Sequence, residues 1–400
     1  MATSAVARLR LDDPDHHRWL QSLTDELFTF YEAAADWFEG GFLWLDDDGH
    51  PSAGPKQLLI TSRMTYCFAL GHLTGRPDCA DTVAHGLAAL RTIFRDEQHG
   101  GWWEPGSATS WPKQTYQHAF VVLASATARI AGLDAADVLT EALAIYDGHL
   151  YDPVDEMPVE AFNRAWTASE DYRGVNATMH TVEALLAAAA STGDEKWRRR
   201  ASGMARRVAG FAAAADWRIP EHFSADWQPL PDYHADRPED QFRPYGVTPG
   251  HAFEWARLLV QLDEPWAAQS AAELFDRAVT DGWDADRGGL VYTTDWRGRP
   301  LVAKRLHWPL TEAIGAACYL HRVTGQRQFA QWYQSFWEYA EQRFIDSERG
   351  GWIHELSPDG RPSHQIWAGK PDMFHALQAT YYARAPIASS LAAALATSGG

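Results

Sequence analysis

Short segments that begin with two glycines recur along the chain, and no other sequence feature constrains the fold as strongly. Glycine allows a positive φ, and Asp-Gly pairs such as Asp48-Gly49 and Asp359-Gly360 form tight turns, so these segments predict small β-hairpins. Weaker versions occur near residues 152–162 and 219–227, which gives six hairpins spaced at roughly 60 residues. The clear starts are Gly40-Gly41-Phe42, Gly100-Gly101-Trp102, Gly288-Gly289-Leu290 and Gly350-Gly351-Trp352.

Between successive hairpins there is room for two helices, and apolar residues recur there at helical spacing. Several of these helices are apolar on every side, which suits an inner ring wrapped by an outer ring. The pattern predicts an all-α fold: an (α/α)6 barrel of twelve helices in one catalytic domain (residues 1–400), with short β-hairpins at the active-site end. An open α-solenoid is the alternative, but solenoid repeats usually have plain turns. The expected helices cover residues 15–39, 58–73, 78–94, 113–131, 134–149, 176–192, 195–214, 250–263, 266–280, 309–323, 328–344 and 371–385.

The net charge and the cysteines limit the partners and the cellular location that we expect for this protein. A net charge of −18 argues against nucleic acid and anionic membranes as partners. No segment has the length and apolarity of a membrane span, and the first fifteen residues lack the apolar stretch of a secretory signal. Cys67, Cys79 and Cys318 form no CxxC pair and are odd in number, so a cytoplasmic location is expected.

The start of each inner helix carries polar residues, often as pairs three or four positions apart that share one helix face. In a barrel these starts surround a central cavity, and buried polar groups cost free energy unless they have a partner. They therefore predict a polar central site. Among the 19 tryptophans, Trp308 and Trp367 stand beside these polar motifs and are expected to contact a sugar ring. The candidate site residues are Arg63, Tyr66, Gln114, Asn176, His180, His251, Glu254, Trp308, Glu312, Trp367, Asp372 and His375.

Neither a metal nor a cofactor is expected. His251 and Glu254 could supply two ligands, but the sequence has no HExxH motif, and Arg63 in the same cavity would repel a cation. No Gly-rich phosphate loop opens any helix. A glycoside hydrolase using Glu254 and Glu312 as flanking carboxylates remains an alternative. A non-catalytic sugar-binding barrel would not need two histidines and Arg63, and a scaffold protein would have apolar helix starts.

Four segments resemble the N-acylglucosamine 2-epimerase superfamily, and the resemblance runs over nearly the whole chain. Its closest branch is that of the D-mannose isomerases, which is also similar to sulfoquinovose isomerases. The family implies an (α/α)6 barrel and metal-free chemistry through two histidines, here His251 and His375. Arg63, Glu254 and His180 match its other conserved positions. The segments are Ser62-Arg63-Met64-Thr65-Tyr66, Asn176-Ala177-Thr178-Met179-His180, Thr248-Pro249-Gly250-His251-Ala252-Phe253-Glu254-Trp255 and Trp367-Ala368-Gly369-Lys370-Pro371-Asp372-Met373-Phe374-His375.

The chemistry of these residues agrees with the resemblance. Moving a carbonyl between C1 and C2 requires ring opening and removal of a weakly acidic C–H proton, for which histidine typically contributes about 10²–10⁴-fold. Arg63 would stabilise the cis-enediolate. Glu254, one turn from His251, would orient that imidazole or bind a sugar hydroxyl. We assign His375 as the C2–C1 proton shuttle and His251 as the ring-opening acid/base, and the exchanged assignment stays open.

The resemblance favours a monosaccharide substrate and interconversion of D-mannose and D-fructose. A 2-epimerase of the N-acylglucosamine, cellobiose or mannose/glucose type remains an alternative, because returning the proton to the opposite face of C2 uses the same two histidines. A sulfoquinovose isomerase also remains open. The sequence does not distinguish a monomer from a homodimer.

Overall fold

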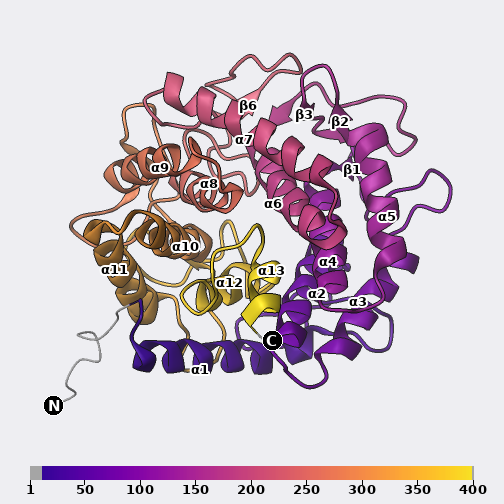
Figure 1. Cartoon of the computed structure of the whole chain (residues 1–400), viewed down its shortest axis with the longest axis horizontal. Helices are drawn as coiled ribbons and strands as arrows, with labels where there is room; N and C mark the ends of the chain where they lie inside the picture. The colour runs from indigo at the N-terminus through magenta and orange to yellow at the C-terminus, as the bar shows by residue number, and fades with distance from the viewer. Residues whose placement is uncertain (1–10, 399–400) are drawn as a thin grey trace.

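The computed structural model describes residues 11–398, and its helices form a closed double ring (Figure 1). The inner helices are buried on nearly every side, whereas the outer helices bury one face. This confirms the predicted (α/α)6 barrel of twelve helices. The inner helices are α2 (Leu58–Leu73), α4 (Thr115–Ile130), α6 (Val175–Thr192), α8 (Pro249–Leu262), α10 (His307–Thr324) and α12 (Phe374–Tyr382); the outer helices are α1 (Pro14–Tyr31), α3 (Cys79–Thr92), α5 (Ala136–Ile145), α7 (Glu195–Ala214), α9 (Ala267–Gly282) and α11 (Arg327–Arg343).

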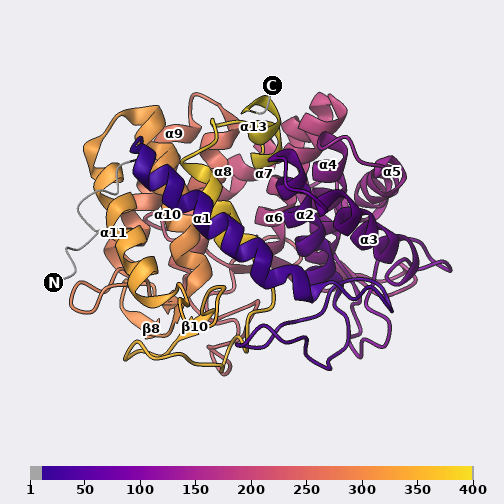
Figure 2. The same ribbon diagram turned by 90° about the horizontal axis from the view of Figure 1, so that it is seen from below.

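The difference between inner and outer helices follows from their sequences. α7 buries Trp197, Met204 and Val208 on one side, and its arginines lie on the side that faces solvent. α6 carries a run of alanines and leucines and is buried all round, as the uniform apolar pattern predicts. Figure 2 shows the loops and short strands at one end of the barrel and the C-terminal helix at the other.

The short strands and single bridges form local hairpins, as predicted, and also join neighbouring repeats. Among the described residues, β2–β3 and β7–β8 pair within one repeat and bridges such as Leu45–Pro51 and Leu356–Pro362 close further hairpins, whereas three sheets join the start of an inner helix to the next repeat. The Gly-Gly segments close through single bridges, such as Ala35–Phe42 and Arg95–Trp102. The strands are β1 (Lys113–Gln114) with β4 (Ala161–Phe162), β2 (Tyr151–Asp152) with β3 (Met157–Pro158), β5 (Arg173–Gly174) with β6 (His222–Phe223), β7 (Thr293–Thr294) with β8 (Pro300–Val302), and β9 (Arg305–Leu306) with β10 (Glu355–Leu356).

The last repeat joins the first, which distinguishes a closed barrel from an open solenoid. A backbone bridge connects Leu45 with Lys370. Deeper in the same seam, the hydroxyl of Tyr31 on α1 donates to the carbonyl of Asp372 at 2.9 Å. The hydroxyls of Thr24 and Thr380 lie 2.8 Å apart between α1 and α12.

Each Gly-Gly segment is fixed by a clasp that the sequence analysis did not recognise. An aspartate four residues before the first glycine accepts the backbone N–H groups two and three positions further on, and also pairs with a lysine or arginine. That cation lies two to four residues before an inner helix, so the clasp fixes the point at which the helix begins. The four clasps are Asp36–Lys56, Asp96–Lys113, Asp284–Arg305 and Asp346–Lys370.

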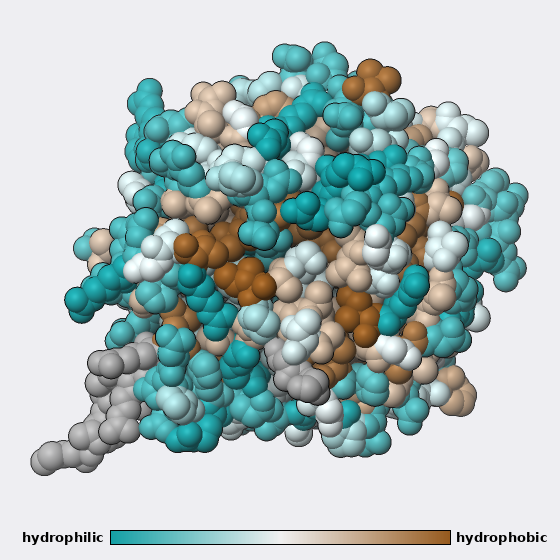
Figure 3. All heavy atoms as spheres, in the orientation of Figure 1, coloured by the Kyte–Doolittle hydropathy of each residue, from teal (hydrophilic) through white to brown (hydrophobic). Residues whose placement is uncertain are grey.

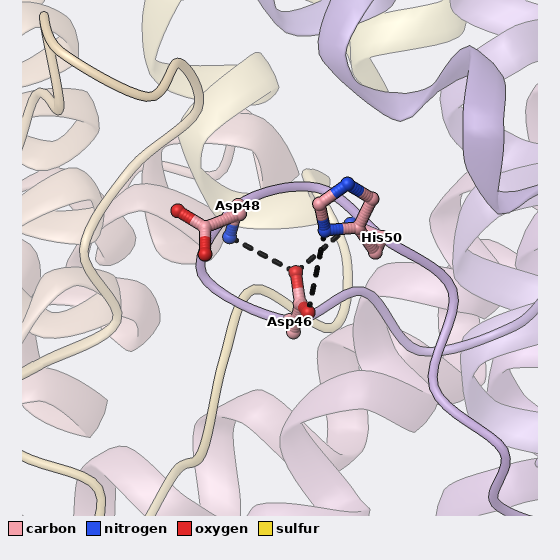
Figure 4. Close-up of side chains that lie close together, drawn as sticks. All are labelled: Asp46, Asp48 and His50. Carbon is pink, nitrogen blue, oxygen red and sulfur yellow. Dashed lines mark hydrogen bonds and ion pairs between the residues drawn. The ribbon is translucent and has the colours of Figure 1, made fainter.

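The turn of the first hairpin gathers two aspartates and a histidine at the surface (Figure 4). Asp46 accepts the backbone N–H groups of Asp48 and His50, both at 2.9 Å. The side chain of Asp46 therefore closes the Asp48-Gly49 turn, and this explains the cluster without a ligand.

A further helix, α13 (Leu391–Ser398), was not predicted. It lies across the end of the barrel opposite the hairpins and contacts α2, α4, α6 and α12. Figure 3 shows this end of the molecule, with hydrophilic side chains around the rim and hydrophobic ones gathered toward the centre. Among the helices of residues 11–398, none combines the length and apolarity needed to cross a membrane.

Candidate active site

The hairpin end of the barrel opens into a central cavity. All six inner helices contribute to it, either from their first two turns or from the residues immediately before them. Five of the side chains around it are histidines, and loops between the repeats complete the wall. The lining residues are Arg63, Tyr116, Asn176, His180, Gln241, Phe242, Pro244, His251, Glu254, Tyr292, His307, Trp308, His354, Trp367, Asp372 and His375.

His251 lies in the first turn of α8, where Pro249 occupies the first helical position. Its Nδ1 donates to Oε2 of Glu221 at 2.8 Å, and both side chains are buried. Glu221 lies directly before β6. The carboxylate that orients His251 is therefore Glu221, whereas the sequence had suggested Glu254. With Nδ1 held by the carboxylate, Nε2 is left as the atom of the ring that can exchange a proton.

His375 has the same kind of support from another helix. Its Nδ1 donates to Oε1 of Glu312 at 2.9 Å, and Oε2 of Glu312 accepts from Nε of Arg257 at 2.7 Å. Burial, followed by the nearby charge of Arg63, holds the pKa of His375 well below its usual range. His375 is therefore neutral at pH 7 and able to accept a proton.

Arg63 presents a fixed cation to the cavity. It donates from Nη1 to Asp372 at 3.1 Å and from Nη2 to the hydroxyl of Tyr116 at 3.0 Å. The rings of Phe120 and Phe374 lie 4.6 and 4.9 Å from its Cζ. This arrangement holds the guanidinium in place before any ligand binds, which is what stabilisation of a developing oxyanion requires.

Glu254 and His180 form the third polar group of the cavity. Nδ1 of His180 lies 3.4 Å from Glu183 and 3.7 Å from Glu254. Burial, followed by repulsion from Glu312, raises the pKa of Glu254 well above its usual range. Burial lowers the pKa of His180.

His180, Glu183 and Glu254 also have oxygen and nitrogen atoms close enough together to hold a metal ion. However, Nη2 of Arg257 lies 3.1 Å from Glu183 and 3.4 Å from Glu254. A divalent cation at this position would face that guanidinium, with Arg63 also nearby. The donor set therefore fits an arginine better than a metal ion.

Trp308 lies against both catalytic candidates. Its ring centroid is 5.2 Å from that of His251 and 5.9 Å from that of His375. A Cβ atom at Gly250 would lie only 2.6 Å from this indole, so the glycine is needed for the close approach. Trp367 lines the same cavity and stacks on Trp44 with centroids 5.8 Å apart.

Three of the predicted site residues lie outside the wall of the cavity. Tyr66 donates to Gln378 at 3.2 Å and lines a small separate cavity toward the α13 end. Glu312 lies behind His375. Gln114 lines a larger outer cavity, which shares Tyr116, Asn176 and Trp367 with the central one. The remaining candidates, Arg63, Asn176, His180, His251, Glu254, Trp308, Trp367, Asp372 and His375, all line the central cavity.

The sequence analysis missed several residues that line the cavity or bond to its side chains. Tyr116, two positions from Gln114, is the member of its motif that faces the cavity. Glu221 and His354 belong to hairpins, where helical spacing gives no signal. His307, directly before Trp308, was not among the predicted site residues.

Comparisons with known proteins identify the family of this chain. The N-acylglucosamine 2-epimerase (GlcNAc 2-epimerase) family matches residues 40–379. A D-mannose isomerase from Pseudomonas cannabina pv. alisalensis is 43% identical, covering 96% of this chain and 97% of that protein. A D-mannose isomerase from Thermobifida fusca is also 43% identical, covering 96% of this chain and 98% of that protein.

A crystal structure of a D-mannose isomerase superposes with a TM-score of 0.86 at 27% identity, covering 92% of this chain and 97% of that one. The structure of cellobiose 2-epimerase from Spirochaeta thermophila DSM 6192 has a TM-score of 0.78 at 19% identity, covering 92% and 97%, and supports the fold alone. Because the family match spans most of the sequence and two relatives align over nearly all of it, the chain belongs to the N-acylglucosamine 2-epimerase family and is an isomerase.

Proposed function

We propose that this protein interconverts D-mannose and D-fructose without a metal ion, through ring opening and proton transfer between C2 and C1. The observation that carries the proposal is the pair His251 and His375. Each histidine has its Nδ1 on a buried glutamate, and both line the cavity that also contains Arg63. The similarity to two D-mannose isomerases supports the choice of sugar.

The reaction begins with opening of the sugar ring. His251 removes the proton of the anomeric hydroxyl through Nε2, the C1–O5 bond breaks as the carbonyl forms at C1, and the His251 imidazolium delivers that proton to O5. The Glu221 carboxylate stabilises the imidazolium formed on the way. The product of this step is the open-chain aldose.

Isomerisation follows at the other histidine. Nε2 of His375 removes the proton on C2, the electrons of that bond form the C1=C2 double bond, and the carbonyl electrons move to O1. Arg63 stabilises the resulting cis-enediolate. Protonated Glu254 gives its proton to O1 and receives the proton of O2. His375 then returns its proton to C1, which leaves a carbonyl at C2 and a hydroxymethyl group at C1.

The buried position of Glu254 supports this role. A protonated carboxyl can donate to one oxygen of the enediolate and accept a proton from the other, and burial beside Glu312 favours the protonated form of Glu254 by raising its pKa. The guanidinium groups of Arg63 and Arg257 on either side of Glu254 support a reaction that needs no divalent cation.

A 2-epimerase is the second candidate. The observation that favours it is that His251 and His375 both contact Trp308 in one cavity, so a second base is available to return the proton to the other face of C2. Epimerisation would regenerate an aldose. The two reactions therefore differ in product and not in the groups required.

NMR of the EDTA-treated protein with D-mannose in D₂O tests the proposal. Formation of fructose is expected, with deuterium at C1 reporting exchange of the transferred proton with solvent. Glucose as the product would establish the 2-epimerase instead. A sample with no turnover until a divalent cation is added would overturn metal independence, and no turnover in either sample would remove mannose as the substrate.

The proposal also covers the cellular location, the single catalytic domain and the oligomeric state. A cytoplasmic location is supported by Cys67, Cys79 and Cys318, which are free and buried thiols. The central cavity supports a single catalytic domain, because every inner helix contributes to it. Analytical ultracentrifugation would distinguish the monomer from the homodimer.

A further inference from the structure

Two histidines of the cavity differ from the other three. His251, His375 and His180 each have Nδ1 within 3.4 Å of a carboxylate oxygen. His307 and His354 have no such partner: the buried ring nitrogens of His307 and Nε2 of His354 have no side-chain partner among the described residues, and the His307 ring lies beside the backbone of His354. Each of the two side chains is only 4% exposed.

The fold brings these two rings together. His307 is the first residue of α10, and His354 directly precedes β10 in the hairpin of the last repeat. Pairing of β9 with β10, continued by a hydrogen bond from His307 N to His354 O at 3.1 Å, sets the two residues side by side. Their ring centroids are 3.9 Å apart. The position of the pair is therefore fixed by the backbone, before any ligand binds.

Both residues line the central cavity, and the ring centroid of His307 lies 6.2 Å from that of His375. A buried polar atom without a partner costs free energy, and this cost is removed when a ligand supplies the missing hydrogen bond. The pair therefore has the features of a binding subsite beside the proton-transfer residues.

The chemistry of the pair indicates what it binds. Burial lowers the pKa of His307 to about 4 and holds the pKa of His354 well below its usual range, so both rings are neutral at pH 7. A neutral imidazole offers one donor and one acceptor, as a hydroxyl group does. Among the described residues that line the cavity, Arg63 is the one arginine or lysine, and Asp372 and Tyr116 already accept from it.

We propose that His307 and His354 form a subsite for hydroxyl groups of the sugar that do not react, and that this subsite selects uncharged sugars over sugar phosphates and sulfonates. The inference rests on the proposed function for the identity of the reaction, and it adds a substrate class. The two histidines are positioning residues in this role. They hold the substrate, whereas His251 and His375 exchange protons with it.

The test uses phenylalanine and asparagine at both positions. Phenylalanine keeps a planar ring in the stack and removes both nitrogens, whereas asparagine keeps one donor and one acceptor. His307→Phe and His354→Phe are each expected to raise KM for D-mannose about tenfold, with kcat changed less than about threefold. His307→Asn and His354→Asn should recover part of that loss. His16→Phe, a buried histidine between α1 and α11, is the matched control and should leave KM unchanged.

Calorimetry with D-mannitol separates binding from chemistry, because this polyol has hydroxyl groups and no carbonyl. The wild-type protein should bind it, and each phenylalanine variant should bind it about tenfold more weakly. Unchanged affinity in variants that melt like the wild type would overturn the subsite. A loss of kcat of a hundredfold or more at unchanged KM would also overturn it, because it would make the pair acid/base groups.

The proposed selection of uncharged sugars is tested separately. D-Mannose 6-phosphate should bind the wild-type protein at least about tenfold more weakly than D-mannose, because no unpaired cation faces the subsite. Equal or tighter binding would overturn the selection of uncharged sugars. If the wild-type protein binds mannitol through these histidines but does not isomerise mannose, the proposed function fails and the subsite stands. If the phenylalanine variants bind as the wild type does while mannose is isomerised, the subsite fails alone.

Discussion

The two halves of the cavity contain the same histidine–glutamate hydrogen bond, but the two glutamates have different surroundings. His251 on one side and His375 on the other each donate Nδ1 to a buried glutamate, at 2.8 and 2.9 Å. Glu221, the partner of His251, comes from a loop, and its Oε1 has no hydrogen bond to a described residue. Glu312, the partner of His375, comes from an inner helix, and Arg257 holds its other oxygen.

Both contacts orient an imidazole, but the two carboxylates are not held equally rigidly. One hydrogen bond is enough to choose the tautomer of a histidine, whereas the Arg257–Glu312–His375 chain also fixes the position of the carboxylate. Transfer of a proton between two adjacent carbons is more sensitive to alignment than transfer between oxygens. The more rigid half therefore suits the carbon chemistry, and the less rigid half suits ring opening.

The largest expected effect comes from removing either imidazole. His375→Ala and His251→Ala should each lower kcat/KM for D-mannose by about 10²–10⁴-fold, because each loses an acid/base group. The two variants should differ in D₂O with D-fructose, which is open-chain for part of the time. His251→Ala should still exchange a C1 proton slowly, and His375→Ala should not. The opposite pattern would exchange the two roles.

The next effect distinguishes the two glutamates. Glu312→Gln removes the charge between His375 and Arg257 and is expected to lower kcat about 10–100-fold, the value of a hydrogen bond to a charged group. Glu221→Gln should cost less, because the loosely held amide can turn to keep one hydrogen bond. Steady-state kinetics and thermal melting of both variants test this. Equal losses in kcat would mean that Arg257 adds nothing to the His375 half.

The pH dependence provides a smaller and more specific test. Because the pKa of His375 is held well below 6.5, the base stays neutral as pH falls through 6.5, and the acid limb of kcat/KM is expected below that value. Glu312→Gln should move this limb lower still, since removing a carboxylate disfavours the imidazolium. Glu221→Gln should leave it in place. A wild-type limb at 6.5 or above would show that burial of His375 does not set the profile.

Burial of histidine side chains also predicts how the stability of the fold depends on pH. The unfolded chain takes up protons on its histidines below about pH 6.5, whereas folded His16 and His307 remain neutral until about 4. Stability should therefore be full above pH 6.5 and should fall as pH is lowered toward 4. Chemical denaturation at several pH values measures this, and His16→Phe should reduce the slope. A stability that stays constant between pH 6.5 and 4.5 would contradict it.

The smallest effect concerns the residue that both halves share. Trp308→Phe keeps an aromatic surface but shortens it, and should slow turnover by about 2–10-fold, the range for one aromatic contact. Since Trp308 touches both imidazoles, ring opening and C1 exchange should slow together. Slowing of only one of these steps would show that the indole supports one half alone.

The sequence predicted the barrel because its repeats are punctuated by glycine pairs that the fold requires. Gly101 and Gly351, for example, have φ values of +69° and +67°. The clasps were missed because Asp96 and Lys113 lie 17 positions apart and no local pattern connects them. The α13 helix was missed because a short alanine-rich segment resembles any helix end.

The site was predicted where its residues sit on helices, and missed where partners come from separate repeats. His251, His375, Arg63 and Glu254 share a cavity because equivalent helix starts meet at one end. Side-chain direction within a motif was harder to predict, which is why Gln114 was chosen and Tyr116 was not. Pairing between neighbouring repeats brings Glu221 to His251 and His354 to the cavity, and a single sequence does not show that pairing.

The α13 helix has a consequence for how molecules enter and leave. It lies across the end of the barrel opposite the hairpins, so we expect sugars to enter and leave at the hairpin end. The substrate and the product would then use the same opening of the cavity, one after the other. The two sugars should exclude each other from the protein, so product accumulation should slow the forward reaction by simple competition.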